Sequence, residues 1–131
     1  MNSNAPTLMP LDRSRVLLLR AKTKAALVNF VMLTRPKFEV TAVHEQLASK
    51  LEQCYERKIR QLCIVTSPED DTISELIAVE FPAWALTNDP TLNILVAGYA
   101  DGVSDGYSKA CERMLTGPRN LQIFDELLDP R

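Results

Sequence analysis

The chain has 131 residues, of which 46% are hydrophobic and 24% charged, with a formal net charge of −2. This composition is ordinary for one globular domain. The slight negative net charge excludes a generally basic surface of the kind that binds nucleic acid. Duplex DNA binding is therefore expected to be weak and nonspecific at most. Apolar stretches fall short of the roughly 20 residues that span a bilayer, and no signal peptide opens the chain, so we expect a soluble cytoplasmic protein without a membrane partner.

Cysteine usage agrees with a reducing compartment. Cys54, Cys63 and Cys111 are odd in number, widely spaced and without the spacing of metal ligands. We expect three reduced, partly buried thiols and no disulfide.

Residues 1–11 contain Pro6 and Pro10 among small polar side chains and are expected to form a flexible arm ahead of a single domain over residues 12–131. Apolar residues at helical spacing then predict a helix over residues 12–33. The first half of this helix is basic, which indicates either a solvated face or a patch that docks on an acidic partner or nucleic acid. Its basic residues are Arg13, Arg15, Arg20, Lys22 and Lys24.

Pro36 is expected to stop this helix, because its ring removes a backbone donor and restricts the preceding residue. Thr41 then suits the N-cap of a second helix that reaches about Arg60. His44 falls in the first turn, where a locally bonded or exposed side chain is the simpler interpretation and a ligand-binding role is the alternative. The expected buried stripe is Leu47, Leu51, Cys54 and Tyr55. The charged residues expected to stay in water are Glu45, Glu52, Glu56 and Arg57.

Residues 62–86 are the stretch around which the chain is organised. A β-branched, apolar run at Leu62–Thr66 predicts a strand, and a polar turn then leads into a helical pattern from Ile73. P-loop proteins hold phosphate with this strand–loop–helix layout. The turn contains no glycine, however, and Ile73 stands where a lysine would precede the hydroxyl of Ser74. The turn therefore has neither a glycine that would let the backbone approach a phosphate closely nor a lysine that would neutralise its charge.

The turn is also acidic, since it carries Glu69, Asp70 and Asp71. Asp70 and Asp71 precede a capping-box pattern, in which Thr72 is the cap and Glu75 follows three residues later. The two carboxylates are expected to take the anion position at the start of the helix that a phosphate would otherwise occupy. A Mg²⁺ or Ca²⁺ site made by the three acids is the alternative, although adjacent acids rarely converge without further ligands.

The second half of the chain continues the alternation of apolar runs and helical patterns. The helix from Ile73 is expected to kink or end at Pro82, and Trp84 is expected in the core. A nearly continuous apolar run at Leu92–Ala97 predicts a second strand. A helix over residues 101–115 follows, and a last short helix is predicted. The apolar residues of that last helix are Leu121, Phe124, Leu127 and Leu128.

These elements predict a helix-rich α/β fold, a truncated P-loop-like unit with a short parallel sheet, with a mainly α fold as the alternative. A sheet of two strands is marginal on its own. We therefore expect the exposed strand edges to be covered by another chain, most simply in a homodimer, or by the N-terminal helix in a monomer.

The central stretch also carries a family resemblance. Residues 25–128 resemble the start of the ATPase domain of the phage terminase large subunit, the motor that packages DNA. The matching residues at matching spacing are Pro68, Ser74, Glu75, Leu76, Phe81, Pro82, Ala83, Trp84, Asn88, Pro90, Ile94, Val96, Ala97 and Tyr99. An upstream set resembles the segment that helps hold adenine, namely Asn29, Phe30, Thr34, Arg35, Pro36, Phe38 and His44.

The phosphate loop departs from this family at the positions that hold ATP. Glu69, Asp70, Thr72 and Ile73 stand where the family has proline, arginine, glycine and lysine, and Ser74 alone keeps the family's residue type. The degenerate loop is Pro68, Glu69, Asp70, Asp71, Thr72, Ile73 and Ser74. Counterparts of the Walker B acids and of the nuclease domain do not occur in these residues. The resemblance therefore implies the family's fold without its ATPase activity.

No Ser/His/Asp or Cys/His arrangement can be assembled from the sequence, so we expect no enzyme and no cofactor. The predicted function is that of a phage- or prophage-encoded, ATPase-dead interaction protein. Its partner would be a packaging motor or a host defence complex, which it would modulate or inhibit as an anti-CRISPR protein does. Candidate partner-binding residues are Glu69, Asp70, Asp71, Arg13, Arg15 and Arg20. The alternatives are a self-assembling structural protein, an inert terminase remnant, or a weak nucleotide binder that uses the adenine-side segment.

Overall fold

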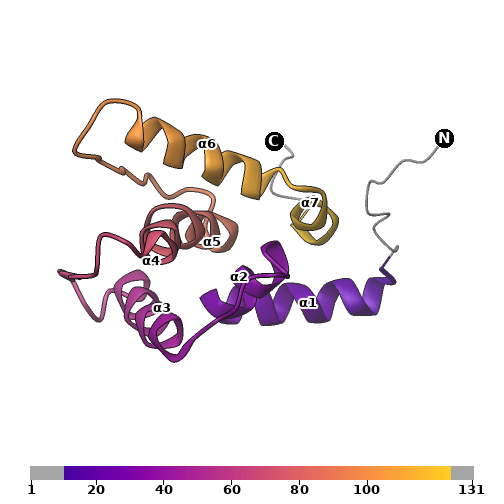
Figure 1. The fold of residues 1–131 in the computed structure, drawn as a ribbon. Coiled ribbons are helices and arrows are strands. Elements are labelled where there is room, and N and C mark those ends of the chain that lie inside the picture. The colour runs from indigo at the N-terminus through magenta and orange to yellow at the C-terminus, as the bar shows by residue number, and fades with distance from the viewer. Residues whose placement is uncertain (1–10, 125–131) are drawn as a thin grey trace.

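The computed structural model describes residues 11–124, and the regular elements in this part of the chain are all helices (Figure 1). The parallel sheet expected from the sequence is therefore wrong for the described residues, and the mainly α alternative is confirmed. Residues 1–10 of the expected arm, and Leu127 and Leu128 of the expected last helix, lie outside the described residues. The helices are α1 Arg13–Ala25, α2 Leu27–Thr34, α3 Ala42–Tyr55, α4 Asp71–Glu75, the π-helical η1 Leu76–Glu80, α5 Phe81–Asn88, α6 Val103–Leu115 and α7 Pro118–Phe124.

Both expected strands are irregular segments that connect helices. Residues 62–66 lie between α3 and α4, and residues 92–97 lie between α5 and α6. The short parallel sheet expected from these two segments does not form, because among the described residues no backbone hydrogen bond joins them and no further strand is present. A β-branched run favours a strand only where it packs on a pleated, half-buried surface, and two strands by themselves give little stability. Both segments have the sequence pattern of a strand, but neither has a neighbouring strand bonded to it.

The single helix expected over residues 12–33 is two helices, because the backbone at Ala26 is extended with φ −144° and ψ 132°. Asp12 caps α1, since its Oδ1 accepts a hydrogen bond from the backbone N–H of Arg15 at 2.7 Å. At the break, Glu52 Oε1 of α3 accepts from the N–H of Leu27 at 2.8 Å and so caps α2. Glu52 was expected in water but is half-buried in this role.

Helix α3 begins after Thr41, as expected, but ends at Tyr55 rather than near Arg60. Arg57 has a left-handed backbone with φ 62°, and its N–H donates to the carbonyl of Cys54 at 3.0 Å. The N–H of Lys58 donates to the carbonyl of Gln53 at 2.9 Å. These two bonds form a Schellman ending, which terminates the helix although no glycine is present.

Helices α4, η1 and α5 follow one another without interruption from Asp71 to Asn88. Pro82 lies in the first turn of α5, directly after the π-helical turn. In a regular α-helix its ring would clash with the carbonyl four residues earlier, whereas the wider π turn ends with the N–H of Phe81 bonded to the carbonyl of Leu76. Pro82 therefore changes the helix type instead of ending the helix.

The core lies where α2, α3 and the α4–α5 run meet. Trp84 is buried there as expected, and its indole N–H donates to the carbonyl of Thr23 at 3.0 Å. The cysteines carry free thiols, and burial raises the pKa of Cys111. Within residues 11–124, none of the helices is both long and apolar enough to cross a bilayer. The main core cluster is Leu27, Phe30, Val31, Leu47, Ala48, Leu51, Ile73, Leu76, Ala83, Trp84 and Ala85.

Candidate functional site

The acidic turn folds back onto the start of α4. Asp70 is the N-cap, and its Oδ1 accepts from the backbone N–H of Thr72 at 3.1 Å and from the hydroxyl of the same residue. The hydroxyl bond lowers the pKa of Asp70 most, and the backbone N–H groups of Thr72 and Ile73 and the nearby His44 lower it further. A carboxylate of the chain itself therefore occupies the donors that a phosphate would need.

The expected capping box does not form. The cap is Asp70 rather than Thr72, and Glu75 does not return to the helix start but bonds Arg35 at 2.7 Å. Asp70 suits the cap better because its carboxylate is charged and sits at the positive end of the helix. Glu69 and Asp71 are exposed. Among the described residues, no group of three or more His, Cys, Asp or Glu side chains could hold a metal ion.

A chain of hydrogen bonds links this cap to α3 through His44, which is 8% exposed. The backbone N–H of Thr41 donates to His44 Nδ1 at 3.1 Å, which leaves the ring proton on Nε2. Nε2 lies 2.9 Å from the hydroxyl oxygen of Thr72, and that hydroxyl in turn donates to Asp70. Thr41, His44, Thr72 and Asp70 thus form a continuous chain of hydrogen bonds from the start of α3 to the start of α4.

Sequence spacing did not reveal this cluster of a histidine, a hydroxyl and a carboxylate. In a nucleophilic triad the imidazole takes the proton of the hydroxyl and the carboxylate orients the imidazole. Here the imidazole donates to the hydroxyl of Thr72, and the hydroxyl donates to a carboxylate whose lowered pKa makes it a poor base. The three groups therefore connect α3 to the start of α4 and are not arranged to activate the hydroxyl as a nucleophile. His44 therefore has the locally bonded role expected from its place in the first turn.

The basic residues of α1 do not share one role. Arg13 and Arg15 are exposed. Arg20 reaches α7, where its Nε donates to the carbonyl of Ile123 at 2.9 Å and its guanidinium lies 6.0 Å from the ring centroid of Phe124. Arg20 therefore helps to hold α7 against α1.

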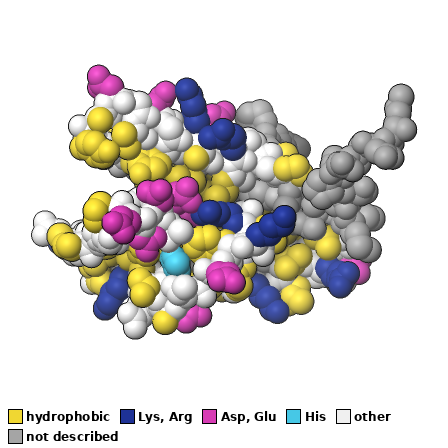
Figure 2. Space-filling model, in the orientation of Figure 1, with side chains coloured by type: hydrophobic (Ala, Val, Ile, Leu, Met, Phe, Trp, Pro, Cys, Tyr) yellow, Lys and Arg dark blue, Asp and Glu magenta, His cyan; other side chains and the backbone are white. Residues whose placement is uncertain are grey.

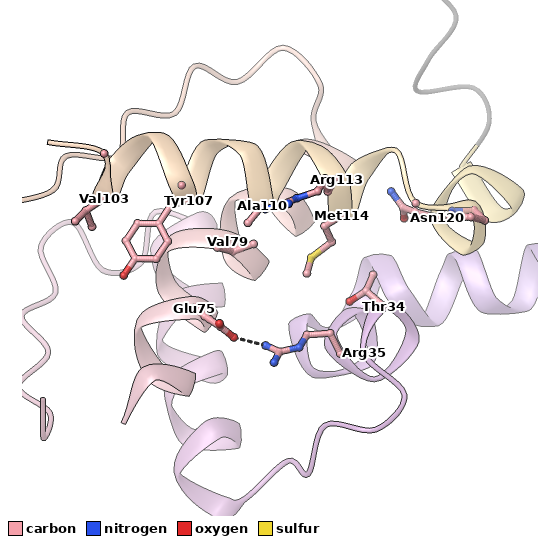
Figure 3. Close-up of a pocket in the computed structure, with 14 residues that line it drawn as sticks. Thr34, Arg35, Glu75, Val79, Val103, Tyr107, Ala110, Arg113, Met114 and Asn120 are labelled. Atoms are coloured by element: carbon pink, nitrogen blue, oxygen red, sulfur yellow. Dashed lines mark hydrogen bonds and ion pairs between the residues drawn. The ribbon is translucent and has the colours of Figure 1, made fainter. Parts of the chain in front are cut away.

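A groove of about 780 Å³ opens between α6 and α7 on one side and α2, α4 and η1 on the other (Figure 3). Tyr107 and Met114 of α6 and Val79 of η1 give it apolar walls. Arg35 and Glu75 lie across from them as an ion pair of 2.7 Å. The volume is in the range of small-molecule sites.

The ion pair continues into the protein, because the same Arg35 nitrogen lies 2.5 Å from Glu80 Oε1. Glu80 is 1% exposed, and burial raises the pKa of its carboxyl, while the guanidinium opposes this shift. Burial alone would lower the pKa of Arg35, but the two carboxylates outweigh it and raise the pKa. Arg35 also lies 4.6 Å above the ring of Phe38. Both carboxylates accept hydrogen bonds from the guanidinium of Arg35, so neither is free to act as a general base.

The pairing of Arg35 with Glu80 was not predicted from the sequence. The available signal was Glu80 itself, a charged residue inside the apolar run between Val79 and Phe81. A carboxylate on the buried side of a helix requires a partner, because an isolated buried charge is very costly. The sequence does not show which cation supplies that partner, since Arg35 is 45 residues away.

No protein-family model, no curated protein and no solved structure matches this sequence. The resemblance to the terminase ATPase domain stays a prediction.

We expect ATP not to bind tightly and not to be hydrolysed. Asp70 already bonds the backbone N–H of Thr72, and Ile73 cannot supply the positive charge that phosphate requires. Calorimetric titration with ATP and Mg²⁺ should give no saturable heat at micromolar concentrations. A micromolar dissociation constant, or turnover abolished by Ser74→Ala, would contradict this expectation.

Proposed function

We propose that the chain is a non-catalytic interaction protein that binds a protein partner and modulates or inhibits it. The observation that carries the proposal is the exposed apolar segment at residues 62–66. Val65 is 93% exposed, and Val43 beside it on α3 is 60% exposed. Figure 2 shows hydrophobic side chains at the tip of the loop that precedes α4. Side chains of this kind at the surface are a marker of a contact site.

The backbone of this segment is also unpaired. Within the described residues, no backbone hydrogen bond involves residues 60–66. A groove of about 610 Å³ runs between the segment and α3, with Leu47, Ile64 and Ile73 among its apolar lining residues. An extended strand of a partner could bond the free backbone groups and place alternate side chains in this groove, as in strand addition.

The terminase resemblance guides the choice of partner. In that family the segment before the phosphate loop is a sheet strand, whereas here its counterpart is exposed and unpaired. A packaging motor whose subunit surface the chain mimics is therefore the first partner to test. A host defence complex, inhibited in the anti-CRISPR manner, is the second. The protein would then act in the cytoplasm of the host cell.

The alternative of a weak nucleotide binder has less support. The polar groups of the adenine-side segment are used internally: Arg35 bonds two carboxylates, His44 bonds Thr72, and the hydroxyl of Thr34 donates to the carbonyl of Phe30 at 2.9 Å. A base entering there would have to displace these bonds.

Affinity purification of the tagged protein from phage-infected cells tests the proposal. The wild-type protein should retain a partner in stoichiometric amount, and Val65→Asp should lose it. Leu17→Asp is the matched control, because Leu17 is also an exposed apolar residue but lies on α1. The purified partner's activity should change when wild-type protein is added. Equal retention by Val65→Asp, or unchanged partner activity, would refute the proposal.

A further inference from the structure

The groove between α6 and the wall formed by α4 and η1 has hydrogen-bond acceptors without partners. Asn120, which lines the groove from α7, is 2% exposed, and its Nδ2 donates to the carbonyl of Leu115 at 2.9 Å. Its Oδ1 is buried and has no partner within the described residues, and the same holds for Oε2 of Glu80. Buried polar atoms are nearly always paired. A molecule suited to this groove is therefore one that donates hydrogen bonds.

The α4–η1 wall also carries an excess of negative charge. The guanidinium of Arg35 serves two carboxylates through one nitrogen, at 2.7 Å from Glu75 and 2.5 Å from Glu80, so the three groups sum to −1. Arg113 on the opposite wall and Asp71, one turn before Glu75, are both exposed and leave this sum unchanged. The side chain of Glu75 is 44% exposed, so its carboxylate can accept from a further donor.

We propose that this groove binds a small organic amine with an apolar body. The ammonium group would lie against the carboxylate of Glu75. Tyr107 lies across from Glu75 on α6, and the face of an aromatic ring attracts a cation (Figure 3). Val79 and Met114 would cover the apolar body. The excess of carboxylates disfavours an anion, and a purely apolar molecule would leave the acceptors unpaired.

The groove and the partner surface of the proposed function are separate. None of residues 62–66 lines the groove, and its volume of about 780 Å³ suits a small molecule. Binding of an amine and binding of a protein partner can therefore be measured independently.

Three probes that share one ring test the preference for an amine: benzylamine, benzyl alcohol and benzoate. Titration followed by NMR of the isotope-labelled protein gives their affinities, which should fall in that order and lie in the millimolar range expected of such small ligands. Glycine amides report the position of the site. Gly102, Gly106 and Gly117 line the groove and should shift with benzylamine, whereas Gly98, outside the lining, should shift less.

Glu75→Gln removes the proposed partner of the ammonium group, while Glu80 still holds Arg35. This variant should bind benzylamine about tenfold more weakly, the usual effect of losing a hydrogen bond to a charged group, and benzyl alcohol almost as the wild type does. Glu45→Gln is the matched control, because Glu45 is an exposed carboxylate on α3 outside the groove lining. It should bind all three probes as the wild type does.

Gly106→Leu tests the site without touching the ion pair. A Cβ added at Gly106 would meet no atom within 4 Å, and leucine favours a helix over glycine, so the variant should fold and its side chain should fill part of the groove. Benzylamine and benzyl alcohol should then both bind more weakly. Benzoate that binds as tightly as benzylamine would overturn the proposal. So would the absence of shifts at the groove glycines, or benzylamine binding that neither Glu75→Gln nor Gly106→Leu weakens.

Discussion

Replacing Arg35 with alanine is expected to lower the free energy of unfolding by about 3–5 kcal/mol at neutral pH, the usual effect of removing one partner of a buried ion pair. Glu80 is 1% exposed, and its second oxygen, Oε2, has no hydrogen-bond partner in the described part of the chain. Without the guanidinium the carboxylate would be buried and unpaired. Urea unfolding followed by circular dichroism measures the change.

The loss should depend on pH. Burial holds the pKa of Glu80 above its ordinary value of 4.5, and removing Arg35 raises it further. A native state that binds a proton more tightly than the unfolded chain loses stability as the pH rises from the unfolded pKa through the folded pKa. The Arg35→Ala deficit should therefore be small below about pH 4.5 and complete above the folded pKa.

A double variant supplies the control. Adding Glu80→Gln to Arg35→Ala removes the buried charge, so it should recover most of the lost stability and abolish the pH dependence of the deficit. A deficit that is the same at every pH, or a double variant as unstable as Arg35→Ala alone, would show that the ion pair is not its cause.

Replacing Trp84 with alanine is expected to cost about 3–5 kcal/mol of stability, as for other buried large-to-small changes. Trp84 meets Tyr55 edge to face at 5.0 Å and stacks on Phe81 at 6.2 Å between ring centroids. Its N–H bonds the carbonyl of Thr23, so one side chain connects α1, α3 and α5.

Trp84→Phe separates the two contributions of this residue. Phenylalanine keeps most of the packing but leaves the buried Thr23 carbonyl without its donor, which costs about 1–3 kcal/mol. Thermal and urea unfolding by circular dichroism should therefore rank the wild type above Trp84→Phe and Trp84→Phe above Trp84→Ala. An alanine variant within about 1 kcal/mol of the wild type would show that the core closes without the indole.

Helix positions could be predicted from the sequence because helical bonds are local. The apolar repeat predicted α3 and α6, and Thr41 marked the start of α3. The break at Ala26 could not be predicted, since its cause is Glu52, which caps α2 from another helix. The early end of α3 depends on a left-handed Arg57, a conformation that sequence rarely signals outside glycine and asparagine.

The two expected strands failed for a related reason. Leu62–Thr66 and Leu92–Ala97 have strand composition, but a strand exists only when a second strand bonds it. The sequence contains two strand-like segments, but it does not show whether the fold brings them side by side. At the candidate site, Asp70 holds the helix start as expected, whereas the expected cap at Thr72 and its capping box with Glu75 do not form. The pairing of Arg35 with Glu80 depends on tertiary contact.

Hydrogen–deuterium exchange of the protein alone and in complex with the partner it retains tests most directly whether this is an interaction protein. Backbone amides of residues 60–66 have no bonds within the described chain and should exchange fast in the free protein. In the complex the same amides should become protected, while the first turn of α4 should not respond to added ATP. Unchanged exchange at residues 60–66 in the complex, or ATP-dependent protection around Asp70 and Thr72, would contradict the account.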